Sequence, residues 1–257
     1  MRVTFLGTGT SHGVPMIACG CAVCRSADPR NRRLRPSILV EREGFVLLVD
    51  TTPDLREQCL RANVQRLDAV LLTHEHNDHL IGLDELRRFC VLQDGRLPLY
   101  GRGEVLQCVE RIFPYAVRRP PPYKGLPEFD LHEVVGPLVI GPLRLTPHLL
   151  PHGAAEVLGL VFSDERGPRF AYYTDCSAVP PVARESLRGI PLLILDALRH
   201  RPHPSHLTIE QALEVARDTR PERVLFTHIC HELDHAATNA KLPEGVRLAH
   251  DGLIVEV

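Results

Sequence analysis

The sequence lacks tryptophan, and aromatic residues make up only 5% of its 257 residues. Because 44% of the residues are hydrophobic, the core has to be built mainly from leucine, valine, isoleucine and alanine. No stretch approaches the roughly 20 apolar residues of a membrane-spanning helix, and the opening segment reaches glycine at position 7, too early for a signal peptide. These absences predict a cytoplasmic protein with no membrane partner.

The sequence also lacks an excess of charge, since its formal net charge is −2. This balance gives no general reason to expect a nucleic-acid partner. One local exception is a basic cluster formed by Arg30, Arg32, Arg33 and Arg35. Two interpretations stay open for Arg33 and Arg35, because they can receive a substrate phosphate or form a solvated basic turn. The length suits one large α/β domain that covers residues 1–257.

Three of the eight cysteines lie close together near the N-terminus, at Cys19, Cys21 and Cys24. The spacing Cys-x-Cys-x-x-Cys places three thiolates in one tight loop, as a structural zinc site requires. A fourth ligand must then come from elsewhere in the chain. The other cysteines are scattered, which predicts free thiols and argues against a disulfide framework.

Short apolar segments alternate with segments in which the apolar residues recur at the spacing of a helix, and this alternation predicts an α/β fold. Thr51 or Thr52 is expected to cap a helix that has Pro53 in its first position, and Thr208 to cap a later one. The proline-rich segment 118–127 is not suited to regular structure. The predicted strands are 2–6, 37–40, 45–49, 67–72, 97–100, 143–146, 157–162, 169–173, 192–195 and 223–226, and the predicted helices are 53–62, 83–92, 104–113 and 207–218.

The segment from Leu71 to His79 has the densest set of candidate metal ligands. It reads Leu-Leu-Thr-His-Glu-His-Asn-Asp-His and directly follows an apolar run. A buried strand would therefore deliver three histidines and an aspartate onto the loop at its end. The alternative is a histidine-rich surface loop that binds nothing. We interpret the segment as part of a metal centre, with candidate ligands His74, His76, Asp78 and His79.

Further candidate ligands follow other apolar strands, at His152, Asp175 and His228. Together with the first set they are enough for two metal ions, with histidines on each ion and a carboxylate between them. His148 competes with His152 for one position. We favour His152 because a glycine follows it, which suits a ligand loop. The pattern predicts a binuclear hydrolase.

The order of these residues resembles the metallo-β-lactamase superfamily, whose His-x-His-x-Asp-His motif corresponds to His74 to His79 and is followed by a histidine, an aspartate and a histidine. The resemblance implies a four-layer αββα fold, with two mixed β-sheets sandwiched between helices. It also implies two divalent ions, Zn or Mn, that lower the pKa of a bridging water, so that the resulting hydroxide attacks the substrate. The implied ligands are His74, His76 and His152 for one ion, Asp78, His79 and His228 for the other, and Asp175 as the bridge.

A narrower resemblance is to the phosphoribosyl cyclic phosphodiesterase family of bacterial phosphonate breakdown. It rests on Gly-Thr-Gly at 7–9, Gly-Val-Pro at 13–15, the cysteine cluster and Thr-His-Ile-Cys-His at 227–231. This family holds a structural zinc with three cysteines and a histidine. The corresponding ligands here are Cys19, Cys21, Cys24 and His231. Cys230 stays open as a rival fourth ligand, and His231 as a plain surface histidine.

The same resemblance implies that His206 reaches into the active site, where it donates a proton to the leaving alkoxide or holds a phosphate oxygen. His200 and His203 lie in the same loop and are alternatives. Asp50 follows a strand and is expected to orient a ligand histidine. His235 is expected at the surface, with a place in the pocket wall as the alternative.

The predicted function is hydrolysis of a small cyclic or nucleotide-like phosphodiester by a binuclear metal centre, with His206, Asp78 and Asp175 as catalytic residues. Two other enzyme classes stay open: a carboxylic ester, thioester or lactone hydrolase, and a non-hydrolytic relative from cofactor biosynthesis. A transfer-RNA 3′-processing nuclease shares the histidine motif, but this chain lacks a basic substrate-binding arm. Both a monomer and a homodimer are compatible with the sequence.

Overall fold

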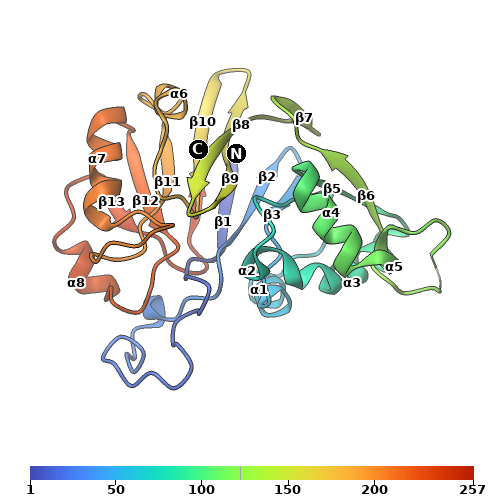
Figure 1. Ribbon diagram of the computed structural model, residues 1–257, viewed down its shortest axis with the longest axis horizontal. Helices are drawn as coiled ribbons and strands as arrows, with labels where there is room; N and C mark the ends of the chain where they lie inside the picture. The colour runs from blue at the N-terminus through green and yellow to red at the C-terminus, as the bar shows by residue number, and fades with distance from the viewer. Residues whose placement is uncertain (122) are drawn as a thin grey trace.

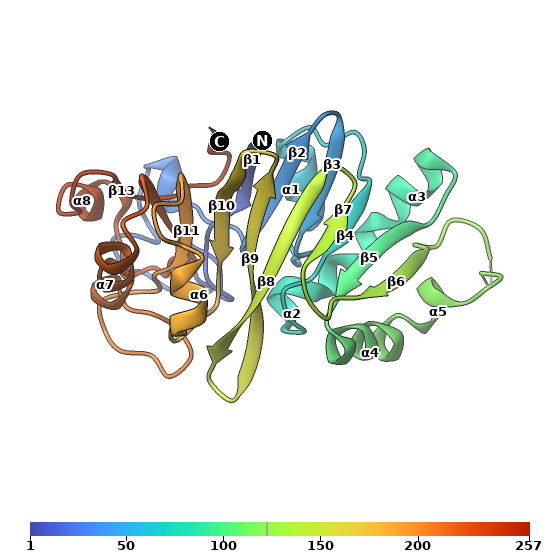
Figure 2. The same ribbon diagram turned by 90° about the horizontal axis from the view of Figure 1, so that it is seen from above.

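The computed structural model describes residues 1–121 and 123–257. Two seven-stranded sheets pack face to face, and helices cover the outer face of each (Figures 1 and 2). This arrangement confirms the four-layer αββα fold expected from the sequence. Among the described residues, no helix is both long and apolar enough to cross a membrane.

The first sheet is mixed, with the order β14-β1-β2-β3-β4-β5-β6. The strands β14, β1, β2 and β3 pair antiparallel, whereas β3 to β6 run parallel. The parallel part brings the segments that follow β3 and β4 to one edge of the sheet. The strands are β1 (Arg2–Gly7), β2 (Ser37–Arg42), β3 (Phe45–Val49), β4 (Ala69–Leu71), β5 (Leu97–Gly101), β6 (Phe129–Glu133) and β14 (Ile254–Glu256).

The second sheet has the order β13-β12-β11-β10-β9-β8-β7 and is parallel from β10 to β13. The carboxyl ends of these parallel strands share one edge, so Asp175, Asp196 and His228 emerge side by side. The strands are β7 (Leu138–Ile140), β8 (Leu143–His152), β9 (Ala155–Asp164), β10 (Gly167–Tyr173), β11 (Leu192–Asp196), β12 (Arg223–Thr227) and β13 (Val246–Leu248).

Helices α1 to α5 lie beside the first sheet and α6 to α8 beside the second (Figure 1). The α-helices are α1 (Leu55–Arg61), α2 (Asn77–Leu80), α3 (Arg87–Gln93), α4 (Gly103–Ile112), α5 (Pro114–Val117), α6 (Pro181–Glu185), α7 (Ile209–Thr219) and α8 (His235–Asn239), and two 3₁₀ helices span Pro29–Asn31 and Ile81–Leu86.

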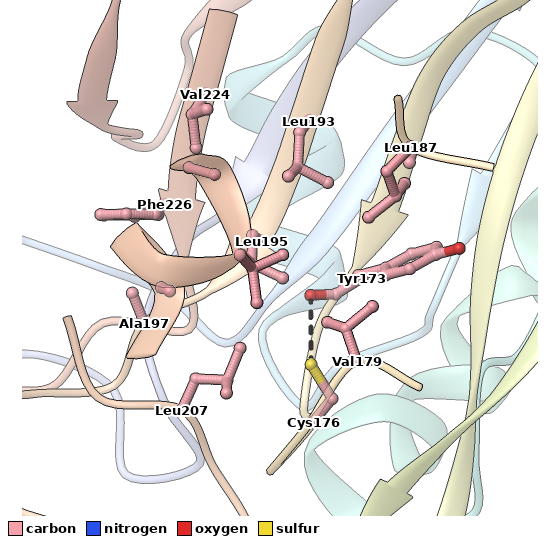
Figure 3. Packing of buried hydrophobic residues seen from close by; sticks show 14 of the residues in the cluster. Tyr173, Cys176, Val179, Leu187, Leu193, Leu195, Ala197, Leu207, Val224 and Phe226 are labelled. Carbon is pink, nitrogen blue, oxygen red and sulfur yellow. Dashed lines mark hydrogen bonds between the residues drawn. The ribbon is translucent and has the colours of Figure 1, made fainter. Parts of the chain in front are cut away.

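Three clusters of buried hydrophobic side chains match the three interfaces between the four layers. The central cluster joins the inner faces of the two sheets, with Phe5 and Val40 from one and Phe162 and Tyr172 from the other. A second cluster lies between the first sheet and helices α1, α3 and α4. The third joins β10 to β12 with α6 and α7, and Figure 3 shows its side chains from all three strands packed together. The apolar area buried at these interfaces holds the strand ends in fixed positions.

The predicted strand at 143–146 is too short, because β8 continues through Pro147 and Pro151 to His152. Beyond Leu145, β9 is the only strand of the described residues that pairs with β8. This part of β8 is therefore an edge strand and tolerates prolines, which cannot donate a backbone hydrogen bond. The longer strand matters because it places His152 at the end of a rigid element.

The predicted helices 53–62 and 83–92 differ most from the structure. Helix α1 begins at Leu55, since Thr52 Oγ1 accepts from the backbone N–H of Asp54 in a turn that includes Pro53. The predicted helix 83–92 is divided into a 3₁₀ helix and α3. The proline-rich segment forms no helix or strand over 118–121 and 123–127, as expected, and its residue 122 lies outside the described residues.

Close packing at Gly82 connects the fold to the histidine motif. Its backbone N–H donates to the oxygen of Thr51, whose own N–H donates to the oxygen of His79. A Cβ at Gly82 would lie 2.0 Å from the oxygen of Thr52. The absence of a side chain at Gly82 therefore allows the segment after His79 to pack on the segment after β3.

We predict that Gly82→Ala lowers the free energy of unfolding by about 2 kcal/mol or more, because backbone has to move to admit the methyl group. The matched control is Gly95→Ala, where the nearest atom to a new Cβ is the oxygen of Gln93 at 3.7 Å. Urea denaturation of both variants measures the difference. Equal stabilities of the two variants would contradict this explanation.

Candidate metal centre and active site

A buried carboxylate, Asp50, holds the histidine motif in place. It follows β3, is fully buried, and accepts hydrogen bonds from the backbone N–H and the hydroxyl of Thr73 at 2.8 and 3.1 Å. Its other oxygen lies 2.8 Å from Nδ1 of His79. A hydrogen bond at Nδ1 directs Nε2 of His79 toward the ligand cluster. Asp50 thus occupies the orienting position expected from the sequence.

The first group of candidate ligands consists of His74, His76 and His152, whose ligand atoms all lie within 4.8 Å of one another. Nδ1 of His74 lies 3.0 Å from the hydroxyl of Thr73, and its buried Nε2 has no hydrogen-bond partner among the described residues. Nε2 of His152 lies 3.2 Å from Nδ1 of His76, while its Nδ1 contacts the backbone oxygen of Ser205 at 2.8 Å. Each ring therefore offers one nitrogen to a common point.

His148 lies outside this group. Its ring is partly buried beside Tyr173, with the ring centroids 6.2 Å apart. Because side chains alternate between two faces along a strand, His148 and His152, four positions apart, belong to the same face of β8. Only His152 lies at the end of the strand, beside the cluster.

The second group consists of Asp78, His79, Asp175 and His228. Nε2 of His79 lies 3.2 Å from one oxygen of Asp175, and Nε2 of His228 lies 2.9 Å from the other. Nevertheless, within the described part of the chain neither nitrogen has a partner in hydrogen-bond geometry. Ligands about 2.0–2.2 Å from one tetrahedral metal ion lie roughly 3.3 Å apart, so this spacing and these unpaired nitrogens suit a bound divalent cation.

The electrostatics of the second group favour positive charge. Burial opposes the protonation of His79, but the carboxylates of Asp175, Asp50 and Asp78 outweigh it and raise the pKa of His79 well above its usual value. Burial likewise opposes protonation of His228, and Asp175 nevertheless raises its pKa to about 10. A field that holds protons on buried imidazoles also attracts a divalent cation, which would displace those protons on binding.

Asp175 lies between the two groups, because its carboxylate also forms a cluster with His152 and His206. Burial would raise its pKa, but His228 and His79 hold that pKa well below its usual range. Asp175 and His228 have positive φ values of 53° and 57°, as has Asp50 at 67°. Non-glycine residues with this backbone are uncommon and concentrate at functional sites.

His206 lies beside the candidate ligands, as expected from the sequence. Its Nδ1 contacts Asp196 at 2.9 Å, and its ring stacks on that of His228 with the centroids 4.5 Å apart. Asp196 is fully buried at the end of β11 and also accepts from the backbone N–H of Cys176. Asp196 directly follows the predicted strand 192–195, and a place at a strand end is the signal that it shares with the other site carboxylates.

The cysteine loop and His231 form a separate cluster. Sγ of Cys19 and Sγ of Cys21 lie 3.3 and 3.4 Å from Nδ1 of His231. The backbone N–H of Cys24 and the ring of His231 lower the pKa of Cys21 to about 6, which favours the thiolate that zinc requires. Cys230 is buried and not part of this cluster. All eight cysteines are free.

Both interpretations of Arg33 are wrong, because only 1% of its surface is exposed. Its guanidinium donates to the backbone oxygens of Cys230 and Leu233 and to the side chain of Asn31. A buried guanidinium that donates to backbone oxygens has a structural role, and this one connects the segment before β2 with the loop that carries His231.

Arg35 and His235 also have structural partners. Arg35 is partly exposed, donating to the carboxylate of Asp54 and the backbone oxygen of Ser11. His235 was expected at the surface but is 4% exposed, and its backbone N–H donates to Asn31. The sequence offers no signal for this burial, because helix α8 has no clear apolar periodicity.

The family of the chain follows from a comparison with known proteins. A family model described as a beta-lactamase superfamily domain matches residues 46–229, which include every candidate ligand of the histidine and aspartate groups. The chain belongs to the metallo-β-lactamase superfamily. As a member with converging histidine and aspartate side chains, it is a metal-dependent hydrolase.

One similar solved structure is described as a new diphosphatase from the PhnP family. It is 40% identical to this metallo-β-lactamase superfamily chain, with a TM-score of 0.91, and the match covers all of this chain and 97% of the other. The expected relation to that branch of the superfamily is thereby confirmed.

Two curated relatives have other names. An octanoyltransferase from Porphyromonas gingivalis is 38% identical over 98% of this chain, but this chain spans only 51% of that protein. A coenzyme PQQ synthesis protein B from Methylobacterium radiotolerans is 30% identical over 76% of this chain and 72% of that protein. Since this chain covers about half of the first relative, the name of that whole protein does not transfer.

We predict that Cys21→Ser lowers the metal content of the purified protein by one ion per chain, because the substitution removes one of the four ligands that a tetrahedral zinc site needs. Cys59→Ser is the matched control, since Cys59 is a free thiol of α1 outside every candidate metal cluster. Elemental mass spectrometry measures the content. An unchanged metal content in Cys21→Ser would refute a structural metal at this loop.

Proposed function

We propose that the chain is a binuclear metal-dependent phosphodiesterase that acts on a small cyclic or nucleotide-like phosphodiester. The observation that carries the proposal is the convergence of two ligand groups on Asp175, with His206 beside both. The similar solved structure is described as a diphosphatase, and that name supports a phosphoryl substrate for this chain.

In this proposal His74, His76 and His152 hold one divalent ion, and Asp78, His79 and His228 hold the other, with Asp175 between them. The ligand types suit Zn or Mn. When bound, the two ions supply a water of lowered pKa and neutralise the negative charge of a phosphodiester. A further zinc held by Cys19, Cys21, Cys24 and His231 would have a structural role.

The chain's own groups then perform two tasks. The side chain of Asp78 is 12% exposed and that of Asp175 is 2% exposed, so of these two catalytic carboxylates Asp78 is the one that water reaches more easily. In the proposal, the carboxylate of Asp78 accepts a hydrogen bond from the attacking water and orients it. His206 supplies the proton for the leaving alkoxide from Nε2, because Asp196 occupies its Nδ1 and fixes the orientation of the ring.

We further infer that residues 1–257 form one domain that acts in the cytoplasm.

The first test compares substrate classes. The purified protein, loaded with Mn²⁺ or Zn²⁺, is expected to hydrolyse bis-p-nitrophenyl phosphate with a higher kcat/KM than p-nitrophenyl acetate, because two cations favour an anionic phosphorus centre. Faster turnover of the acyl ester would instead support the carboxylic ester alternative.

A second candidate function is cleavage of a diphosphate bond, which the description of the similar structure as a diphosphatase favours. Hydrolysis of a nucleoside diphosphate ester by the purified protein tests this candidate.

A second prediction tests the proton donor. His206→Ala should lower kcat on a 2′,3′-cyclic nucleotide by about 10²–10⁴-fold, because its alkoxide leaving group needs a proton. The loss on bis-p-nitrophenyl phosphate should be much smaller, since p-nitrophenolate leaves without one. His200→Ala is the control, because His200 is exposed and contacts Glu210. Equal losses of His206→Ala on both substrates would contradict a proton-donor role.

A further inference from the structure

His203 forms the outer end of a row of histidine rings at the candidate active site. The ring of His76 lies 4.9 Å from that of His152, His152 lies 4.8 Å from His206, and His206 lies 5.0 Å from His203, measured between centroids. The two inner rings are buried, whereas His76 is exposed and His203 is half-buried. The row therefore reaches solvent at both ends, where a substrate would first meet it.

The loop around His203 fixes which ring nitrogen can donate. The backbone N–H of Ser205 donates to Nδ1 of His203, at 3.3 Å, and the hydroxyl of Ser205 lies 3.1 Å from the same nitrogen. A ring that accepts at Nδ1 carries its proton at Nε2. No described residue accepts a hydrogen bond from this Nε2, so the donor is available to a ligand.

The position of the ring is held from several sides. Pro202 and Pro204 flank His203 and restrict the backbone, and Arg199 donates to the oxygen of Pro202. Ser205 also contacts the candidate ligand His152 through its backbone oxygen. The same residue thus orients His152 on one side and His203 on the other, which couples the donor at His203 to the geometry of the metal ligands.

We propose that His203 is a substrate-positioning residue whose Nε2–H donates to a non-bridging oxygen of the substrate's phosphoryl group. The proposal rests on the proposed phosphodiesterase function for its substrate class. A single N–H donor suits an anionic phosphoryl oxygen, and charge-assisted hydrogen bonds are stronger than neutral ones. His203 takes no part in proton transfer, since its Nδ1 faces its own loop and His206 lies nearer the buried ligands.

The test compares three variants: His203→Ala, His203→Gln and His200→Ala. His203→Ala should raise KM for bis-p-nitrophenyl phosphate roughly tenfold with little change in kcat, as expected for the loss of one hydrogen bond to a charged group. His203→Gln retains an N–H donor at a similar reach and should keep most of the wild-type KM. His200→Ala, in the same loop but paired with Glu210 in solvent, should match the wild type.

A binding measurement separates this inference from the proposed function. Isothermal titration of the metal-loaded protein with inorganic phosphate should show roughly tenfold weaker binding for His203→Ala than for wild type or His200→Ala. This result would support His203 as a phosphoryl contact even if the diester were not turned over. Unchanged phosphate affinity in His203→Ala would overturn the inference, whatever the activity, and so would a failure of His203→Gln to bind better than His203→Ala.

Discussion

The candidate site depends on one buried carboxylate, Asp175, which contacts histidines delivered by both sheets. His79 comes from the segment after β4 of the first sheet, and His228 follows β12 of the second. A buried carboxylate is costly unless positive charge compensates it. The two imidazoles do so by keeping protons, or by sharing a divalent cation with Asp175. The same charged groups thus join the two sheets and form the candidate metal site.

This requirement explains why so many polar groups lie at one edge of the fold. The parallel strands of each sheet end at the same side, and the apolar layers hold those ends in place. Asp50 and Asp196, each fully buried, then fix the rings of His79 and His206. The cysteine cluster extends this support, because its His231 lies three residues after His228. Arg33 holds the same loop by donating to the backbone oxygens of Cys230 and Leu233.

The sequence predicted the fold class, and the candidate ligands that it named lie close together in the structure, because both depend on local patterns. Apolar runs ending in histidine or aspartate mark strand ends, and Cys-x-Cys-x-x-Cys marks a ligand loop. Contacts distant in sequence were not predictable in the same way. The burial of Arg33 depends on carbonyl oxygens about 200 residues away, and that of His235 on Asn31. The length of β8 was missed because its prolines are compatible with a strand only at a sheet edge.

The most direct test of the account is anomalous X-ray diffraction at the zinc absorption edge from crystals of the zinc-loaded protein. Two peaks are expected about 3.5–4 Å apart on either side of Asp175, and a third among the sulfurs of Cys19, Cys21 and Cys24. A single peak near His74, His76 and His152 would contradict a binuclear centre, and the absence of a peak at the cysteines would contradict the structural zinc.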